Sequence, residues 1–167
     1  MGTALEDLGD VRRRASDLGF EPIGDIALLP RGFESGEGVD DLSFDAETAT
    51  LRKLLAESGV NVQQPRMVEG ATEVHVEKSA AWVAPLIFIG ARMLVEAPET
   101  ISLLLAVLEQ FVIRVTRGLH NPSVKLTFAL ETEEGKEYKR LSYEGPPQAI
   151  KEVEELIKGI SNGQDSL

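Results

Sequence analysis

Two histidines and their acidic neighbours are the first residues that could carry chemistry in this sequence. His75 and Glu77 alternate along an extended segment, so both could face the same side and supply half of a metal site. A zinc site needs three or four such ligands. The other histidine, His120, stands alone, and the chain has no cysteine. We therefore expect no metal site and no thiol chemistry.

Glycines and acids between residues 31 and 45 raise two further possibilities, a phosphate-binding loop and a calcium loop. A phosphate-binding loop requires a lysine followed by serine or threonine after its last glycine, and no lysine follows Gly38. A calcium loop requires acids at alternate positions, then a glycine and a closing glutamate. Asp40, Asp41 and Asp45 do not match that spacing. The segment is therefore interpreted as an acidic linker, and no cofactor is expected.

Carboxylates alone could still form a hydrolase, with Glu131, Glu133 or Glu134 acting beside Asp40 or Asp41. Two carboxylates perform acid–base catalysis only where burial drives their pKa values apart. Glu133 and Glu134 fall at a predicted turn, where exposure to solvent prevents burial from separating the pKa values of two carboxyl groups. A hydrolase built on acids is thus kept as an alternative, and the leading expectation is a protein that is not an enzyme.

The chain of 167 residues carries a formal net charge of −11. This charge argues against binding to nucleic acid or to anionic lipid, since both depend on clustered lysine and arginine. It favours a well-solvated surface or a basic partner. Arg12, Arg13 and Arg14 form a local exception, either as a small anion or partner site or as a solvated helix face. The charged first twenty residues do not resemble a signal sequence, so a cytoplasmic location is expected.

Residues 80–118 form the most apolar stretch, and other elements must be arranged around it. Pro98 divides this stretch into predicted helices at 85–95 and 98–116, because proline is accepted in the first turn of a helix but interrupts a preceding one. The apolar surface could be a buried core, a partner-binding face or a membrane-inserting hairpin. Charges at Arg92, Glu96, Glu109 and Arg114 oppose insertion into a bilayer. The candidate interaction residues are Trp82, Phe88, Leu104, Leu108 and Phe111, together with Arg12, Arg13 and Arg14.

A β-hairpin is predicted after the apolar helices. Apolar residues alternate with polar ones through 124–130, and 137–143 forms the second strand. A turn centred on Glu134-Gly135 places Phe128 opposite Leu141 and Leu126 opposite Tyr143, all on one face. A final amphipathic helix is predicted from Pro146-Pro147 to about residue 160.

The remaining predicted elements are helices at 3–18 and 46–58, a short strand at 26–29 and extended pieces at 60–68 and 72–77. Together these elements indicate an α+β fold with a small, mostly antiparallel sheet that includes the 124–143 hairpin. The apolar helices should pack on one face of it. We divide the chain into an N-terminal helix and acidic linker (1–45), an α+β domain (46–160) and a flexible tail (161–167).

The order of elements from about residue 46 resembles the effector-associated constant-component domains of bacterial conflict (immunity) systems. The similarity depends on residues 50–55, on the apolar helix ending at Arg114 and Arg117, and on the hairpin turning at Gly135. It implies a small adaptor, without enzymatic activity, that couples a sensor to an effector in antiviral defence. We therefore expect a protein-interaction module with an effector, a sensor or another copy of itself as partner. A membrane-active component using residues 80–115 is the alternative.

Overall fold

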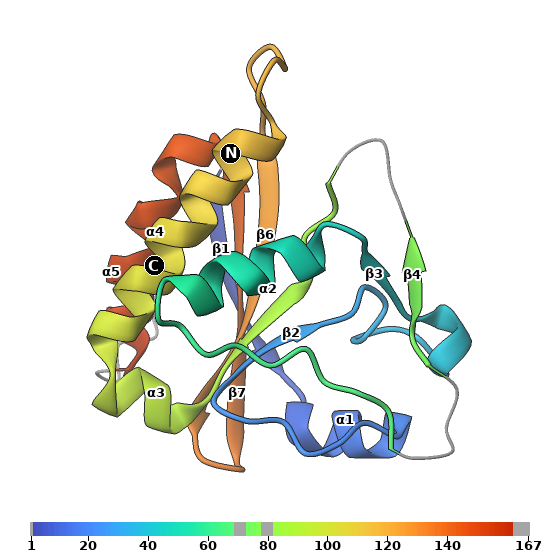
Figure 1. Ribbon diagram of the computed structural model, residues 1–167. Helices are drawn as coiled ribbons and strands as arrows, with labels where there is room; N and C mark the ends of the chain where they lie inside the picture. Colours follow the sequence, from blue (N-terminus) through green and yellow to red (C-terminus); the bar gives the residue numbers. More distant parts are fainter. Residues whose placement is uncertain (1, 69–72, 78–81, 162–167) are drawn as a thin grey trace.

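The computed structural model describes residues 2–68, 73–77 and 82–161 (Figure 1). Its centre is a five-stranded sheet in the order β1-β7-β6-β5-β2. In that sheet β5 and β6 run parallel and the other neighbouring pairs are antiparallel. The predicted α+β fold with a mostly antiparallel sheet is confirmed. The strands are β1 (Gly2–Leu8), β2 (Ile26–Leu29), β5 (Leu86–Ile89), β6 (Val124–Glu133) and β7 (Glu137–Gly145).

Most helices form a layer on one face of this sheet (Figure 1). Their inward side chains and those of the strands, Leu108 and Phe128 among them, form one core cluster. The elements of this layer are α2 (Thr48–Glu57), α3 (Ala91–Glu96), α4 (Pro98–Val115), the 3₁₀ helix η2 (Pro147–Glu152) and α5 (Val153–Ser161). The predicted packing of apolar helices on one face is correct for α3, α4 and α5.

The opposite face of the sheet is also covered, which the sequence did not indicate. Helix α1 (Val11–Leu18) and side chains from the following loops, including Phe33 and Met67, form a second core cluster there. A smaller parallel pair, β3 (Ser43–Asp45) and β4 (His75–Glu77), lies beside this layer, after the 3₁₀ helix η1 (Val39–Asp41). Part of the predicted acidic linker is therefore ordered structure.

Strand β5 is covered on both faces of the sheet, and this explains why its sequence pattern indicates the start of a helix. The predicted helix at 85–95 is instead β5 followed by the short helix α3. Ile87 and Ile89 belong to the first core cluster, whereas Leu86 and Phe88 belong to the second. A strand buried on both faces has no polar alternation, so its apolar run cannot be told from a buried helix by periodicity.

The predicted helix at 3–18 is wrong in its first half. Residues 2–8 form strand β1, and α1 begins only after Asp10, whose carboxylate accepts a hydrogen bond from the Arg13 N–H at 3.0 Å. Every residue of β1 has a register partner on β7, and this tertiary contact outweighs the local helical pattern.

The β-hairpin between β6 and β7 forms with the predicted register. Phe128 pairs with Leu141 and Leu126 with Tyr143. The turn itself differs, because a register shift between Glu131 and Glu133 lengthens the connection beyond a two-residue turn. Gly135 has a φ of 69°, a conformation that costs glycine little. Glu131 precedes the shift and continues the alternation of Ala129, so its side chain faces the α1 side of the sheet.

The first 45 residues are not a separate appendage, because β1 and β2 are the two edge strands of the central sheet. Helix α2 confirms the prediction at 46–58 and β2 that at 26–29. The predicted flexible tail after Ser161 lies outside the described residues, as do residue 72 of the second extended piece and residues 69–71, which join the two pieces. Among the helices that the structure describes, none combines the length and the apolarity needed to cross a bilayer.

Candidate functional site

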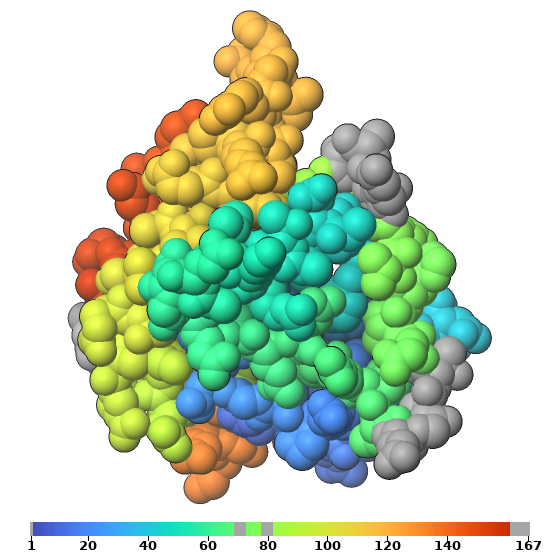
Figure 2. Space-filling view, viewed as in Figure 1, coloured from blue at the N-terminus to red at the C-terminus, as the bar shows by residue number. Residues whose placement is uncertain are grey.

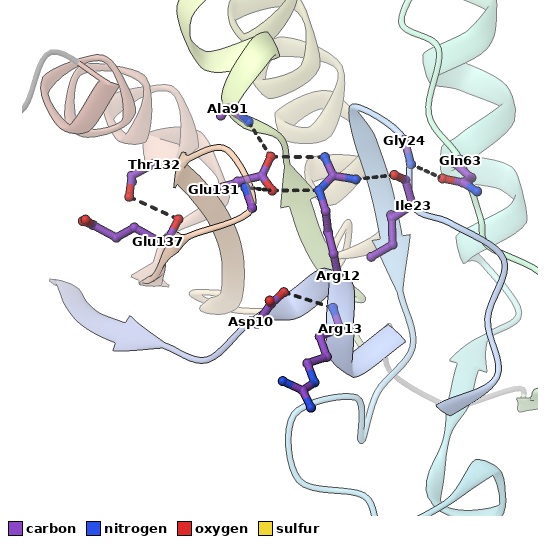
Figure 3. Close-up of polar contacts among 11 residues, drawn as sticks. Asp10, Arg12, Arg13, Ile23, Gly24, Gln63, Ala91, Glu131, Thr132 and Glu137 are labelled. Carbon is purple, nitrogen blue, oxygen red and sulfur yellow. Dashed lines mark hydrogen bonds and ion pairs between the residues drawn. The ribbon is translucent and has the colours of Figure 1, made fainter. Parts of the chain in front are cut away.

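A buried ion pair joins α1 to the end of β6 (Figure 3). Arg12 Nε lies 2.7 Å from Glu131 Oε2, and Arg12 Nη2 lies 3.1 Å from Glu131 Oε1. The same guanidinium donates to the Ile23 carbonyl and lies 5.1 Å from the centre of the Phe88 ring. The Glu131 side chain is 1% exposed. The pair therefore fixes α1 against the sheet.

Backbone groups complete the coordination of the Glu131 carboxylate. The Ala91 N–H donates to Oε1 at 3.0 Å, and the Gly135 N–H donates to Oε2 at 3.2 Å. A Cβ atom on Gly90 would lie 3.2 Å from Arg12 Nη2 and 3.3 Å from the Asp25 carbonyl oxygen. Glycine at position 90 therefore lets the backbone before α3 approach the ion pair closely.

The electrostatics of this cluster keep Glu131 charged. Burial raises the pKa of Glu131, but hydrogen bonds from Arg12, Ala91 and Gly135 and the charge of Arg12 outweigh burial and lower the pKa to about 2. Burial also raises the pKa of the neighbouring Tyr138, and the carboxylates of Glu131 and Asp10 raise it further. A carboxylate held ionised in this way cannot act as a proton donor near neutral pH. The arrangement is that of a structural anchor.

The three consecutive arginines do not form one basic surface. Arg12 is committed to Glu131, and Arg14 donates to the carbonyl oxygens of Phe33, at 2.9 Å, and Gly36. Arg13 has an exposed side chain. The expectation of a joint anion or partner site at these positions is corrected, since two of the three guanidinium groups hold the protein's own loops.

Four of the five apolar candidate residues are inside the protein. Phe88, Leu104, Leu108 and Phe111 are each at most 2% exposed and belong to the two core clusters. They are therefore not available to a partner in this conformation, and the buried-core interpretation of residues 80–116 is the one that agrees with the structure. Trp82 is half-buried, and its ring meets the Phe111 ring edge-to-face at 5.3 Å.

The remaining candidate chemical groups are not gathered into one site. His75 Nε2 lies 3.7 Å from Glu77 Oε1 on the exposed strand β4, and His120 Nε2 lies 3.2 Å from the side-chain amide nitrogen of the neighbouring Asn121. Within residues 2–68, 73–77 and 82–161, no group of three or more His, Cys, Asp or Glu could hold a metal ion. Glu131, the hydrolase candidate nearest the core, is paired with Arg12.

Strand β1 presents an open sheet edge. It pairs with β7 in one continuous register from Gly2–Glu144 to Leu8–Tyr138, without a bulge. In the described part of the chain no other strand pairs with it, so its outer backbone groups face away from the sheet. It contains neither proline nor lysine, residues that often protect such edges. Its two acids are paired inward: Lys139 Nζ lies 2.6 Å from Asp7 Oδ1, and Arg140 binds Glu6.

A cavity of about 700 Å³ lies near the beginnings of β5 and β6. Its walls come from the loop after β2, from the residues preceding β5 and from the protruding segment between α4 and β6, at the top of Figure 2. Its charged lining residues are Arg31, Glu34, Arg117 and Lys125, and its hydroxyl-bearing lining residues are Ser35, Thr116, Ser123 and Thr127.

Sequence reasoning missed both of these features. The β1 edge was hidden because residues 2–8 also fit a helical pattern. The cavity draws on four separate segments, and no spacing in the sequence connects Arg117 and Lys125 with Trp82. Only the three-dimensional arrangement brings them together.

The comparisons with known proteins add no relative. No protein-family model, no curated protein and no solved structure matches this chain. The site must therefore be interpreted from its own geometry.

Proposed function

We propose that this protein is an interaction module, without enzymatic activity, that adds an extended segment of a partner protein to the open edge of β1. The observation that carries this proposal is the seven-residue, unbulged edge of β1, which β7 pairs on one side only among the described residues. Such an edge offers a row of backbone donors and acceptors to an incoming strand. Strand addition of this kind is a recurrent mode of peptide recognition.

The charge of the chain favours a basic segment in this role. Two copies of a chain with net charge −11 repel each other over the range of the Debye length. A partner segment carrying lysine and arginine is instead attracted to the same surface, and its association is accelerated. The proposal therefore commits to a basic strand from a different protein and not to a second copy of this chain.

The family resemblance supplies the biological setting of this proposal. An adaptor in a bacterial immunity system, located in the cytoplasm, would bring a sensor and an effector together through such an edge. The products of adjacent genes are the natural first partners to measure by calorimetry. The resemblance covers residues from about 46 onwards and so suggests an adaptor without including β1. The edge can be tested by itself without knowing the partner.

A displayed library of short random peptides, selected on the full chain, tests the proposal. We expect the selected peptides to be rich in lysine and arginine and to bind less tightly as salt concentration rises. Two neighbouring substitutions, Thr3→Pro and Ala4→Pro, then locate the binding. In an antiparallel ladder the N–H groups of successive residues point to alternate sides. One proline therefore removes a bond to β7, and the other removes only an outward donor.

The outcome of the two substitutions is unequal if the proposal is right. The proline variant that removes an N–H group facing away from β7 should keep its melting temperature and lose peptide affinity. The variant that removes an N–H group bonded to β7 should have a lower melting temperature. Thr3→Val and Ala4→Val are matched controls that keep the N–H group and the strand preference. Two folded proline variants that bind selected peptides as tightly as the unmodified chain would rule out the β1 edge as the docking surface.

A further inference from the structure

The cavity at the beginnings of β5 and β6 has unpaired positive charge in an otherwise acidic protein. Four charged residues line it. Arg31 lies 2.5 Å from Glu77, and Glu34 lies 2.7 Å from Arg140, so both are neutralised by partners. Arg117 and Lys125 form no ion pair with any residue that the structure describes. Two cations thus remain to attract an anion.

Lys125 has one potential competitor for that anion. Glu144 on β7 is its register partner in the β6–β7 ladder, but the two side chains form no ion pair in the structure. The Glu144 side chain is exposed, and a solvated cross-strand pair of this kind would contribute at most about 1 kcal/mol. Glu144 therefore leaves Lys125 available to an anion in the cavity.

The rest of the wall is apolar and contains an unsatisfied donor. Phe33, Pro85, Leu86, Val115 and Leu119 contribute to it. Trp82 also lines the cavity, and its indole Nε1 is buried with no hydrogen-bond acceptor among the described residues. Buried donors of this kind are usually paired, and a ligand oxygen that reached the Nε1 atom would satisfy it. The volume, about 700 Å³, falls in the range typical of small-molecule sites.

We propose that this cavity binds a small organic acid, a molecule with an apolar body and one carboxylate, with Arg117 and Lys125 attracting the carboxylate. The apolar walls would contact the body of the ligand, and Trp82 would donate to an oxygen of it. The proposal depends on the cavity alone and not on the β1 edge, so either can fail without the other.

Trp82 is the single tryptophan of the chain, and its fluorescence therefore reports directly on the cavity. We suggest titrating the full chain with phenylbutyrate and with its neutral analogue phenylbutanamide, following Trp82 emission and heat of binding. We expect saturable binding of phenylbutyrate with a change in Trp82 emission, and binding of the amide that is weaker by about tenfold or more, the equivalent of 1.4 kcal/mol.

Two double variants distinguish the effect of the charges in the cavity on ligand binding from the effect of the net charge of the chain. Arg117→Gln with Lys125→Gln should weaken phenylbutyrate binding by about tenfold or more. Arg92→Gln with Lys136→Gln changes the net charge equally at two exposed residues outside the cavity lining, and it should leave the affinity unchanged. Equal binding of acid and amide, equal weakening by the two double variants, or no saturable binding at all would each overturn the proposal.

Discussion

At the scale of single residues, the Glu131 carboxylate accepts four hydrogen bonds, two from Arg12 and one each from the backbone of Ala91 and Gly135. None of these partners is close to Glu131 in sequence except Gly135. The sequence could therefore identify Arg12 and Glu131 as candidates for separate sites, but it could not reveal that they form one pair. Their association depends on the two layers of the fold.

Replacing Glu131 should make the acid sensitivity of this pair measurable. The folded pKa of about 2 lies below the usual value of 4.5, so the carboxylate stabilises the folded state above about pH 4.5 and loses this effect as the pH falls towards 2. Because Arg12 is about one third exposed, screening limits the contribution to about 2–3 kcal/mol. We expect Glu131→Gln to be less stable than the unmodified chain at neutral pH. In urea titrations, the difference in free energy of unfolding between the two proteins should become smaller below pH 4.5.

Glu133→Gln provides the matched control for this measurement. Glu133 is on the same strand, but its side chain is exposed and pairs with Lys136 at 3.7 Å. Its substitution should change the stability by less than about 1 kcal/mol at any pH. A gap between Glu131→Gln and the unmodified chain that stays constant from neutral pH to pH 2 would show that the Arg12–Glu131 pair is not the source of the acid sensitivity.

A second residue-scale prediction concerns Gly90. Its φ of −74° is accessible to any residue, so the effect of a substitution here is one of space and not of backbone strain. A methyl group would crowd Arg12 and the Asp25 carbonyl oxygen. We expect Gly90→Ala to lower the free energy of unfolding by about 1–2 kcal/mol. A free energy of unfolding for Gly90→Ala equal to that of the unmodified chain would show that the space around Gly90 is not limiting.

At the scale of elements, the helix α4 and the strand β6 form the centre of the larger core. Leu108 and Phe128 are fully buried there. We expect Leu108→Ala and Phe128→Ala each to cost about 3–4 kcal/mol in free energy of unfolding. Leu103 is on the same helix but is 39% exposed. Leu103→Ala should cost less than about 1 kcal/mol, and comparable losses at Leu103 and Leu108 would contradict the orientation of α4.

The hairpin, which has one buried face, and the short strand β2 could be predicted from the sequence, whereas β5 and β1 could not. The hairpin alternates apolar and polar residues, so even its register was correct. Strand β5 is buried on both faces, and its uniform apolar run resembles a helix. Strand β1 is exposed along most of its length. Its Leu5 and Leu8 contact different core clusters, and this spacing also fits a helix face.

At the scale of the whole molecule, two surfaces at separate places carry the functional proposals. The β1 edge continues the central sheet, and the cavity lies where β5 and β6 begin. The sequence predicted the class of fold but neither surface, because each requires residues from several segments. If both proposals hold, one chain would bind an extended basic segment and a small organic acid at independent sites.

Amide hydrogen exchange in β1, measured with and without a selected basic peptide, tests the central proposal most directly. The amides of β1 that bond to β7 should exchange slowly in both states. The alternate, outward amides should exchange quickly in the free protein and become protected when the peptide binds, because they then donate to the added strand. Protection that appears elsewhere in the chain, while the outward amides of residues 2–8 continue to exchange quickly, would contradict strand addition at this edge.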